Sequence, residues 1–231
     1  VSHFHSASTS SSMTTCTTNG GAVEGQKGDN ILEASNAANI NVPHFCLHTS
    51  LSVVWQCRMR LVEIEGMPKL QAGCSTTVKD GMKIHVWNEK VDEARKGQME
   101  FLLINHPLDF PICDKAGECP LQDYSFNYGT VNSRYGEFKR TYPGMDRTPI
   151  GPHVVQNMNR CIHCTRCIRF TSEITGTGEL AFFKRGASTE VGVLPGTPID
   201  NGRSAGVTDV CPTGGITKRD FVLRARGGNP E

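Results

Sequence analysis

The stretch Arg160-Cys161-Ile162-His163-Cys164-Thr165-Arg166-Cys167-Ile168-Arg169 places three cysteines at intervals of three residues. A fourth cysteine, Cys211, follows at a distance and stands directly before Pro212. Thiols at this spacing can all point into one small loop, and a Cys-Pro corner can close the cage around it. Four thiolates around one compact inorganic core are the ligand set of a cubane [4Fe–4S] cluster. We therefore expect such a cluster, and with it electron transfer, at Cys161, Cys164, Cys167 and Cys211.

Two other uses of these cysteines fit the pattern less well. Structural zinc sites take two separated Cys-x-x-Cys pairs, or one such pair with histidines, rather than a triplet and a remote Cys-Pro. Disulfides need an oxidising compartment, and the sequence has no stretch that resembles a secretory signal. The iron–sulfur interpretation is therefore favoured over both.

The bulk composition limits the remaining possibilities. The chain has 231 residues, enough for one large domain or two to three small ones, and its hydrophobic content of 37% is lean. Ten clustered cysteines and a lean core suggest that bound metal contributes to folding. The net charge of +1 argues against general nucleic-acid binding and against electrostatic attachment to membranes. The longest apolar runs, such as residues 99–104, are too short to span a bilayer.

The first part of the chain predicts a small α+β domain. Residues 1–18 are rich in Ser, Thr and His, partly like a transit peptide but without arginine, and residues 1–12 are expected to form a disordered tail. Residues 13–18 and 21–25 flank Asn19-Gly20, the pair typical of a type I′ hairpin turn. A short helix is expected at residues 30–39, with strands at 61–64 and 83–87. We assign residues 13–88 to this domain.

Two further regions follow. A helix is predicted from Glu89 to Asn105, ending at His106-Pro107 because the residue before proline is disfavoured in a helix. The rest of the second region, residues 89–150, is expected to be rich in loops. The third region, residues 151–231, holds the cysteine triplet and a predicted helix at 165–175, with Gly176 as its stop.

Two incomplete cysteine groups precede the triplet. The first is Cys46, Cys57 and Cys74; the companion that a [2Fe–2S] loop pair needs three residues after Cys57 is Arg60, whose guanidinium has no lone pair for iron. Ordinary half-buried thiols are the alternative for this group. The second is His106, Cys113 and Cys119 in a loop kept irregular by proline and glycine. On spacing alone, a histidine before proline is more often a helix-end residue than a ligand.

The sequence around all three groups resembles that of one family over roughly residues 13–226. The stretches that carry the resemblance are specific: V-P-H-F-C, Q-C-R-M, L-V-E-I-E-G-M-P-K-L-Q, M-E-F-L-L-I-N-H-P-L-D, I-C-D-K-A-G-E-C-P-L-Q-D, R-C-I-H-C-T-R-C-I-R-F-T-S-E-I-T-G-T-G-E-L and V-C-P-T-G. They resemble the N-terminal iron–sulfur region of the 75 kDa, or G, subunit of NADH:quinone oxidoreductase (respiratory complex I).

The resemblance implies three clusters and a fold for each. Members of the family begin with a plant-ferredoxin-like (β-grasp) [2Fe–2S] domain. A loop-rich [4Fe–4S] segment with one histidine ligand follows, and then a small α/β [4Fe–4S] domain with four cysteine ligands. The first cluster maps onto Cys46, Cys57 and Cys74, with a ligand missing at Arg60. The second maps onto His106, Cys113 and Cys119, with a ligand missing at Phe110. The third maps without loss onto Cys161, Cys164, Cys167 and Cys211.

Three departures from the family pattern concern the first two clusters. Arg60 and Phe110 replace cysteines, and Val54-Trp55 stands where the family has small residues in the loop around the [2Fe–2S] cluster. A single base change converts a Cys codon to Arg or Phe, so sequence error and editing of the message are both open explanations. The family also continues into a large domain related to molybdopterin enzymes, which the sequence to Glu231 does not include.

The function that the resemblance implies is an electron relay with no catalytic site of its own. Electrons would pass from a flavin-bearing, NADH-oxidising subunit toward quinone-side iron–sulfur subunits, with this chain attached to the inner membrane through those partners, on the matrix or bacterial cytoplasmic side. Two alternatives stay open. One is the relay subunit of a NAD-linked hydrogenase or formate dehydrogenase; the other is a degenerate scaffold paralogue that has lost its clusters.

Other residues near the ligands allow more than one interpretation. Residues 176–181 match the dinucleotide fingerprint G-x-G-x-x-A, but they follow a predicted helix rather than a strand, which favours a helix-ending turn. For the histidines near the cysteines, surface or hydrogen-bonding roles are expected more often than ligation: His44, His48 and His163. The arginines beside the ligands either tune cluster potentials or are simply solvated: Arg58, Arg160, Arg166 and Arg169.

Overall fold

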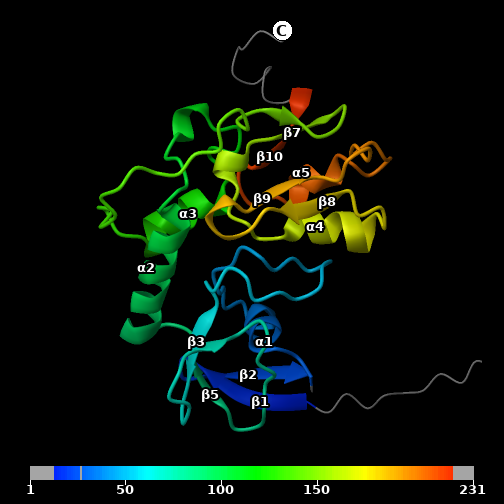
Figure 1. The fold of residues 1–231 in the computed structure, drawn as a ribbon. Coiled ribbons are helices and arrows are strands. Elements are labelled where there is room, and N and C mark those ends of the chain that lie inside the picture. Colours follow the sequence, from blue (N-terminus) through cyan, green and yellow to red (C-terminus); the bar gives the residue numbers. More distant parts are fainter. Residues whose placement is uncertain (1–12, 27, 221–231) are drawn as a thin grey trace, which may run out of the picture. The chain divides into compact units, whose positions relative to one another are not determined.

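The computed structural model describes residues 13–26 and 28–220, and Figure 1 draws their fold. The tail expected at residues 1–12 lies outside the described residues. Contacts divide the chain into two units, residues 1–43 with 60–92 and residues 44–59 with 93–231. Both mix helices with strands.

The first unit is built on a five-stranded sheet in the order β2-β1-β5-β3-β4. Strands β1 (Met13–Thr18) and β2 (Gly21–Gln26) form the predicted hairpin, with Cys16 opposite Val23. Asn19 and Gly20 have φ of 49° and 83°, the positive values that a type I′ turn needs. Strand β5 (Lys83–His85) runs parallel to β1, and β3 (Leu61–Ile64) pairs antiparallel with β5 and with β4 (Gln71–Ala72).

Helix α1 (Ile31–Ala37) packs against strand β2 of this sheet. The helix begins at Asn30, whose side chain accepts from the backbone of Glu33 while the Glu33 carboxylate accepts from the backbone of Asn30. This reciprocal pairing is a capping box, which satisfies two backbone donors that the first turn would otherwise leave free. The buried apolar side chains of the unit come from the helix and the sheet together: Cys16, Val23, Ile31, Leu32, Val62 and Ile84.

Two helices follow the strands of the first unit along the chain, and the first of them begins in residues 89–92 of that unit. Helix α2 (Glu89–Leu103) ends just before His106-Pro107, as the sequence predicts. The ammonium of Lys139 donates to the carbonyl oxygens of Leu103 and Ile104, at 2.5 and 3.2 Å, and so satisfies acceptors at the end of this helix. Helix α3 (Pro120–Tyr128) begins with proline at its first position, directly after Cys119, in a region that the sequence pattern predicted to be rich in loops.

The rest of the second unit consists of short elements. Strands β6 (Thr148–Pro149), β7 (Val154–Gln156) and β10 (Ile216–Lys218) form one antiparallel sheet, and β8 (Leu180–Phe183) pairs with β9 (Glu190–Val193) in another. Short turns of 3-10 helix lie at Phe110–Ile112, Met158–Arg160 and Gly186–Ser188. Helix α5 (Gly206–Val210) leads directly into Cys211.

The helix expected at residues 165–175 is present but changes its geometry. Helix α4 (Arg166–Arg169) is α-helical, and the next turn, Phe170–Ile174, widens into a π-helix. Gly176 follows with φ of 72°, in the left-handed region that favours glycine at a helix end. The G-x-G-x-x-A stretch therefore ends a helix and enters β8 (Figure 1), which confirms the helix-ending turn.

Two apolar cores lie within the second unit. One gathers side chains of the small sheets and the adjoining helices, including Val154, Phe170 and Val207. The other contains cysteines from all three groups together with large apolar side chains: Phe45, Cys46, Cys57, Met59, Met99, Cys119, Leu121 and Cys164. Within the part of the chain that the structure describes, every helix is too short or too polar to cross a bilayer.

Candidate iron–sulfur centres

The four-cysteine group converges on one cavity of the second unit. Cys161 follows the 3-10 turn at Met158–Arg160, Cys167 lies in α4, and Cys211 caps α5. His163 and Thr165 have φ of 54° and 64°, so the backbone reverses twice between the cysteines of the triplet. All four thiols line one cavity, with Gln156, Val191 and Ile216 among its other walls: Cys161, Cys164, Cys167 and Cys211.

Burial raises the pKa of three of these thiols, those of Cys161, Cys164 and Cys167. Desolvation, followed by the charge of Cys211, raises the pKa of Cys164 to about 12. Burial likewise raises the pKa of Cys161 and of Cys167 far above the usual range of a thiol, with the neighbouring cysteines adding to the effect. Four thiolates that line one cavity would repel one another, so bound metal cations are what would stabilise them as a set.

Two glycines let the backbone pass close to the cysteines, where a side chain would not fit without a shift of its neighbours. A Cβ on Gly215 would stand 3.2 Å from Cα of Cys161, and a Cβ on Gly214 would stand 2.6 Å from Sγ of Cys113. The loop from Cys211 to Gly215 therefore runs close to thiols of two different groups. Among the described residues, no three His, Cys, Asp or Glu side chains are close enough to hold a single ion. The thiolates of a cubane stand further apart than ligands of one ion, because iron and sulfide lie between them, so a cluster fits this donor set.

The second group, His106, Cys113 and Cys119, lines a neighbouring cavity of the same unit. Phe110 lines that cavity too, so the residue at the fourth position lies beside the three candidate donors. Sγ of Cys119 is 3.7 Å from the carbonyl oxygen of Pro212, again on the loop after Cys211. The structure thus brings this group next to the four-cysteine group.

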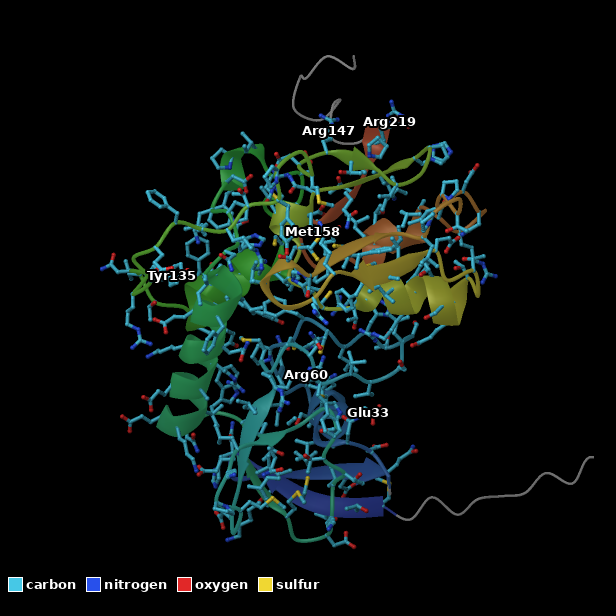
Figure 2. All side chains as sticks on the ribbon, viewed as in Figure 1. Glu33, Arg60, Tyr135, Arg147, Met158 and Arg219 are labelled. Carbon is cyan, nitrogen blue, oxygen red and sulfur yellow. The ribbon has the colours of Figure 1, made fainter. Side chains whose placement is uncertain are left out.

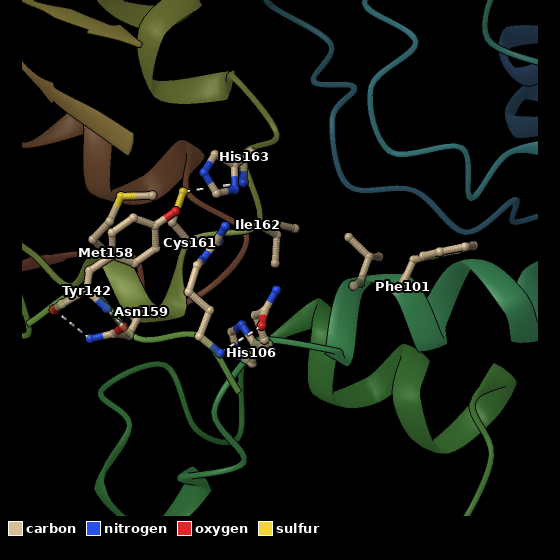
Figure 3. A pocket seen from close by; sticks show the side chains of 11 residues that line it. Phe101, His106, Tyr142, Met158, Asn159, Cys161, Ile162 and His163 are labelled. Carbon is tan, nitrogen blue, oxygen red and sulfur yellow. Dashed lines mark hydrogen bonds between the residues drawn. The ribbon is translucent and has the colours of Figure 1, made fainter. Parts of the chain in front are cut away.

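His106 is buried, and its Nδ1 has no hydrogen-bond partner among the described residues. Burial lowers the pKa of its imidazole to about 4, which keeps the ring neutral and able to donate a lone pair. Figure 3 shows His106 and Cys161 on the wall of one pocket of about 140 Å³, together with Tyr142, Asn159 and His163. An unpaired, neutral imidazole beside cysteines fits a ligand better than it fits a helix-end residue.

The first group is divided between the two units. Cys46 and Cys57 lie in the second unit, where the thiol of Cys46 donates to Sγ of Cys57 at 3.4 Å. This hydrogen bond is the largest cause that lowers the pKa of Cys57 to about 5. Cys74 is buried in the first unit. Trp55, one of the departures from the family pattern, is 58% exposed, so its ring does not fill the space beside these thiols.

Arg60, in the first unit, is the residue that fits its surroundings least. Its side chain is 2% exposed, and none of its guanidinium nitrogens has a hydrogen-bond partner among the described residues. Figure 2 labels it. The amide of Gly73, next to Cys74, donates to the backbone carbonyl of Arg60 at 2.9 Å. An uncompensated buried charge is costly, so arginine does not suit this buried position. The pattern C-x-x-R also lacks the second cysteine that the usual spacing of iron ligands requires.

The arginines beside the ligands differ in burial: Arg160 and Arg169 are buried, Arg166 is half-buried and Arg58 is exposed. Arg160 and Arg169 are each 7% exposed. Arg160 pairs with Asp109 at 2.7 Å and with Asp114 at 3.6 Å, on the loop of the second group. His163 is hydrogen-bonded to the carbonyl oxygen of Thr189 at 3.0 Å and stacks on Phe182, the structural role expected for it. The burial of Arg160 and Arg169 was not predicted, because the position of an arginine next to a ligand in the sequence does not show whether its side chain will be buried.

Comparison with known families divides the chain into three iron–sulfur regions. Residues 11–89 match a 2Fe-2S iron-sulfur cluster binding domain. Residues 95–134 match the NADH-ubiquinone oxidoreductase-G iron-sulfur binding region. Residues 151–217 match the ferredoxin-like domain of NADH-quinone oxidoreductase subunit 3. These matches confirm the expected ferredoxin-like fold and both expected classes of cluster.

Curated relatives carry matching names. The chain is 44% identical over 205 residues to the NADH-ubiquinone oxidoreductase 75 kDa subunit of Reclinomonas americana, and 40% identical over 212 residues to the mitochondrial NADH-ubiquinone oxidoreductase 78 kDa subunit of Candida albicans. These alignments cover 89% and 91% of this chain but 29% of each relative, so it spans under a third of their length. Among solved structures, a chain of a NAD+-reducing [NiFe]-hydrogenase in the H2-reduced state matches with a TM-score of 0.78 at 25% identity, over 89% of this chain and 87% of that one.

Proposed function

Because this chain is a relative of the 75 kDa, or G, iron–sulfur subunits of NADH:quinone oxidoreductase, we propose that it is the electron-relay part of such a subunit. Electrons enter from a flavin-bearing partner that oxidises NADH and leave toward partners that reduce quinone. The observation that carries the proposal is the convergence of Cys161, Cys164, Cys167 and Cys211 on one cavity, next to the cavity of His106, Cys113 and Cys119. No bond-making site of its own is needed for this role.

The role of the protein in such a relay is to hold the clusters and set their surroundings. Bound clusters supply the redox chemistry; the chain supplies thiolates, excludes water and fixes the spacing. We assign [4Fe–4S] clusters to the four-cysteine group and to His106, Cys113 and Cys119, and a [2Fe–2S] cluster to Cys46, Cys57 and Cys74. The three domains that carry them are residues 13–88, 89–150 and 151–231. Attachment to the inner membrane follows through partner subunits, on the matrix or bacterial cytoplasmic side.

Metal analysis tests this proposal directly. The chain, purified without oxygen, is expected to contain about four iron and four sulfide from the four-cysteine cluster, and about ten iron with all three clusters. Low-temperature EPR after dithionite reduction should show the [4Fe–4S] type. Colourless protein with iron near zero would refute the relay and leave the scaffold alternative.

The similarity to the hydrogenase chain supports a second candidate, the relay subunit of a NAD-linked hydrogenase. Both candidates pass electrons between a nicotinamide-oxidising or -reducing site and a distant acceptor, so the clusters alone do not separate them. The metals of the complex do. Nickel in the complex purified with this chain would favour the hydrogenase, and molybdenum or tungsten would favour a formate dehydrogenase.

The cavity of the second group yields a separate prediction. Phe110→Cys places a thiol on the wall that His106, Cys113 and Cys119 share. We expect the variant to retain more iron than the parent after a timed challenge with chelator, because a fourth thiolate closes the cluster's open corner. Phe110→Ser is the control, since it makes the same space without a thiolate. Equal iron retention in the two variants would contradict a ligand role at this position.

A further inference from the structure

Arg169 joins two cysteine-bearing segments of the second unit. Its Nη2 donates to the carbonyl oxygen of Cys46 and, at 3.4 Å, to the carbonyl oxygen of Cys164. Its Nη1 donates to the carbonyl oxygen of Ser52 at 2.6 Å. Its Nε donates to Oγ1 of Thr165 at 3.2 Å. Every nitrogen of this buried guanidinium is therefore used, and the acceptors come from residues 46–52 and from the loop of the triplet.

Neighbouring side chains hold the same segment. The carboxylate of Glu173 accepts from the amide of Ser52 at 2.8 Å and from its hydroxyl at 2.5 Å. The guanidinium of Arg166 donates to the carbonyl oxygen of Leu47 and, at 3.3 Å, to that of Val210, which precedes Cys211. Three long side chains of one helical stretch, residues 166–173, thus hold residues 46–52 by hydrogen bonds.

We propose that Arg169 is the positioning residue that sets the separation and the electronic coupling between the cluster at Cys46 and Cys57 and the cluster of the four-cysteine group. Cys46 and Cys164 are candidate ligands of different clusters, and a single guanidinium nitrogen is hydrogen-bonded to the backbone of both. These two hydrogen bonds connect the two ligand loops directly. The inference rests on the proposed function, because it presupposes that both sites hold clusters.

The planar guanidinium is what makes the bridge possible. Arginine presents five donors in a rigid fork, while lysine presents one flexible ammonium with the same charge. Lysine at position 169 would keep the positive charge near both clusters but would not reach four acceptors at once. The bridge and the charge are therefore separable by substitution.

The test uses the full chain, purified without oxygen, with Arg169→Gln, Arg169→Lys and, as control, Arg203→Gln. Arg203 is an exposed arginine of the same unit whose guanidinium donates to the carbonyl oxygen of Ile174 at 3.4 Å. Iron, sulfide and the EPR of each cluster are measured first. The rate of electron transfer between the two clusters after rapid photoreduction, and their magnetic interaction when both are reduced, are measured next.

Both Arg169 variants are expected to keep their clusters but to lose roughly tenfold or more in the inter-cluster rate, since small displacements of reacting groups are costly. The control should match the parent. A parental rate in both variants, or full rescue by lysine, would overturn the bridge. A parent with the four-cysteine cluster but none at Cys46 and Cys57 would overturn it too, while leaving the relay proposal in place. A parent without any cluster would instead refute the proposed function.

A second variant covers the case in which Arg169→Gln does not fold. Glu173→Gln loosens the hold on Ser52 without touching a cysteine or its carbonyl. It is expected to weaken the magnetic interaction between the two clusters, because residues 46–52 are then less firmly fixed. An interaction identical to that of the parent would overturn the inference.

Discussion

Replacing Cys164 by serine is expected to remove the four-cysteine cluster from the chain. The variant should contain about four iron and four sulfide fewer than the parent and should lack the corresponding EPR spectrum. A serine hydroxyl does not ionise as a thiol does, so one iron is left without its ligand. Because the site exists only in the folded chain, metal binding contributes to folding, and the second unit should also unfold at a lower temperature.

Cys16→Ser is the matched control for this experiment. Cys16 is as well buried as the candidate ligands, at 1% exposure, but it lies in strand β1 of the first unit, and no iron site is assigned to it. The same chemical change there should cost some stability and leave the iron content unchanged. Full iron and an unaltered spectrum in Cys164→Ser would show that the ligands of this cluster have been assigned wrongly.

Local sequence patterns were sufficient where a strong local preference decides the structure. The hairpin around Asn19-Gly20 follows from residues that tolerate positive φ, and the end of α2 follows from the proline at position 107. Helix α3 was missed because it lies in a stretch rich in loop-forming residues and buries only Leu121. The small sheets were missed because strands of two to four residues, such as β6 and β7, are too short to show alternation.

Long-range contacts determine the features of the structure that local sequence patterns did not predict. The cysteine triplet predicts a cluster by itself, but nothing in the spacing shows that residues 44–59 group with residues 93–231. That grouping is made by side chains distant in sequence, since Arg169 and Glu173 reach Ser52 across more than a hundred residues. The grouping of the triplet cysteines was therefore accessible from local patterns, while the links between the cysteine loops were not.

Replacing Arg60 by cysteine is expected to have the second large effect. Unlike Cys164→Ser, it should raise the stability of the protein. Removing a buried guanidinium without a hydrogen-bond partner among the described residues should stabilise the protein by about 3 kcal/mol or more. The new thiol would stand three residues after Cys57, the spacing of a plant-type [2Fe–2S] loop. The [2Fe–2S] cluster assigned to Cys46, Cys57 and Cys74 should also survive a timed challenge with chelator for longer, because the new thiolate gives it a fourth cysteine ligand.

Arg60→Leu separates the two effects. Leucine removes the charge and fills much of the same space, but it offers no ligand to iron. Both variants should unfold at higher denaturant concentration than the parent, and only the cysteine variant should keep more iron and more of the [2Fe–2S] EPR spectrum than the parent after the same challenge with chelator. If the cysteine variant gains stability but loses its iron as fast as the parent, the buried charge alone accounts for the effect and residue 60 is not a ligand.

The same reasoning applies to the polypeptide as the cell makes it. A buried guanidinium without a hydrogen-bond partner in the described part of the chain destabilises the fold, and one base change separates its codon from cysteine. Peptide mass spectrometry of the natural protein should therefore find cysteine at position 60 if the message is edited. Arginine at that position, in protein that nonetheless holds a complete [2Fe–2S] cluster, would mean that another group serves as the fourth ligand.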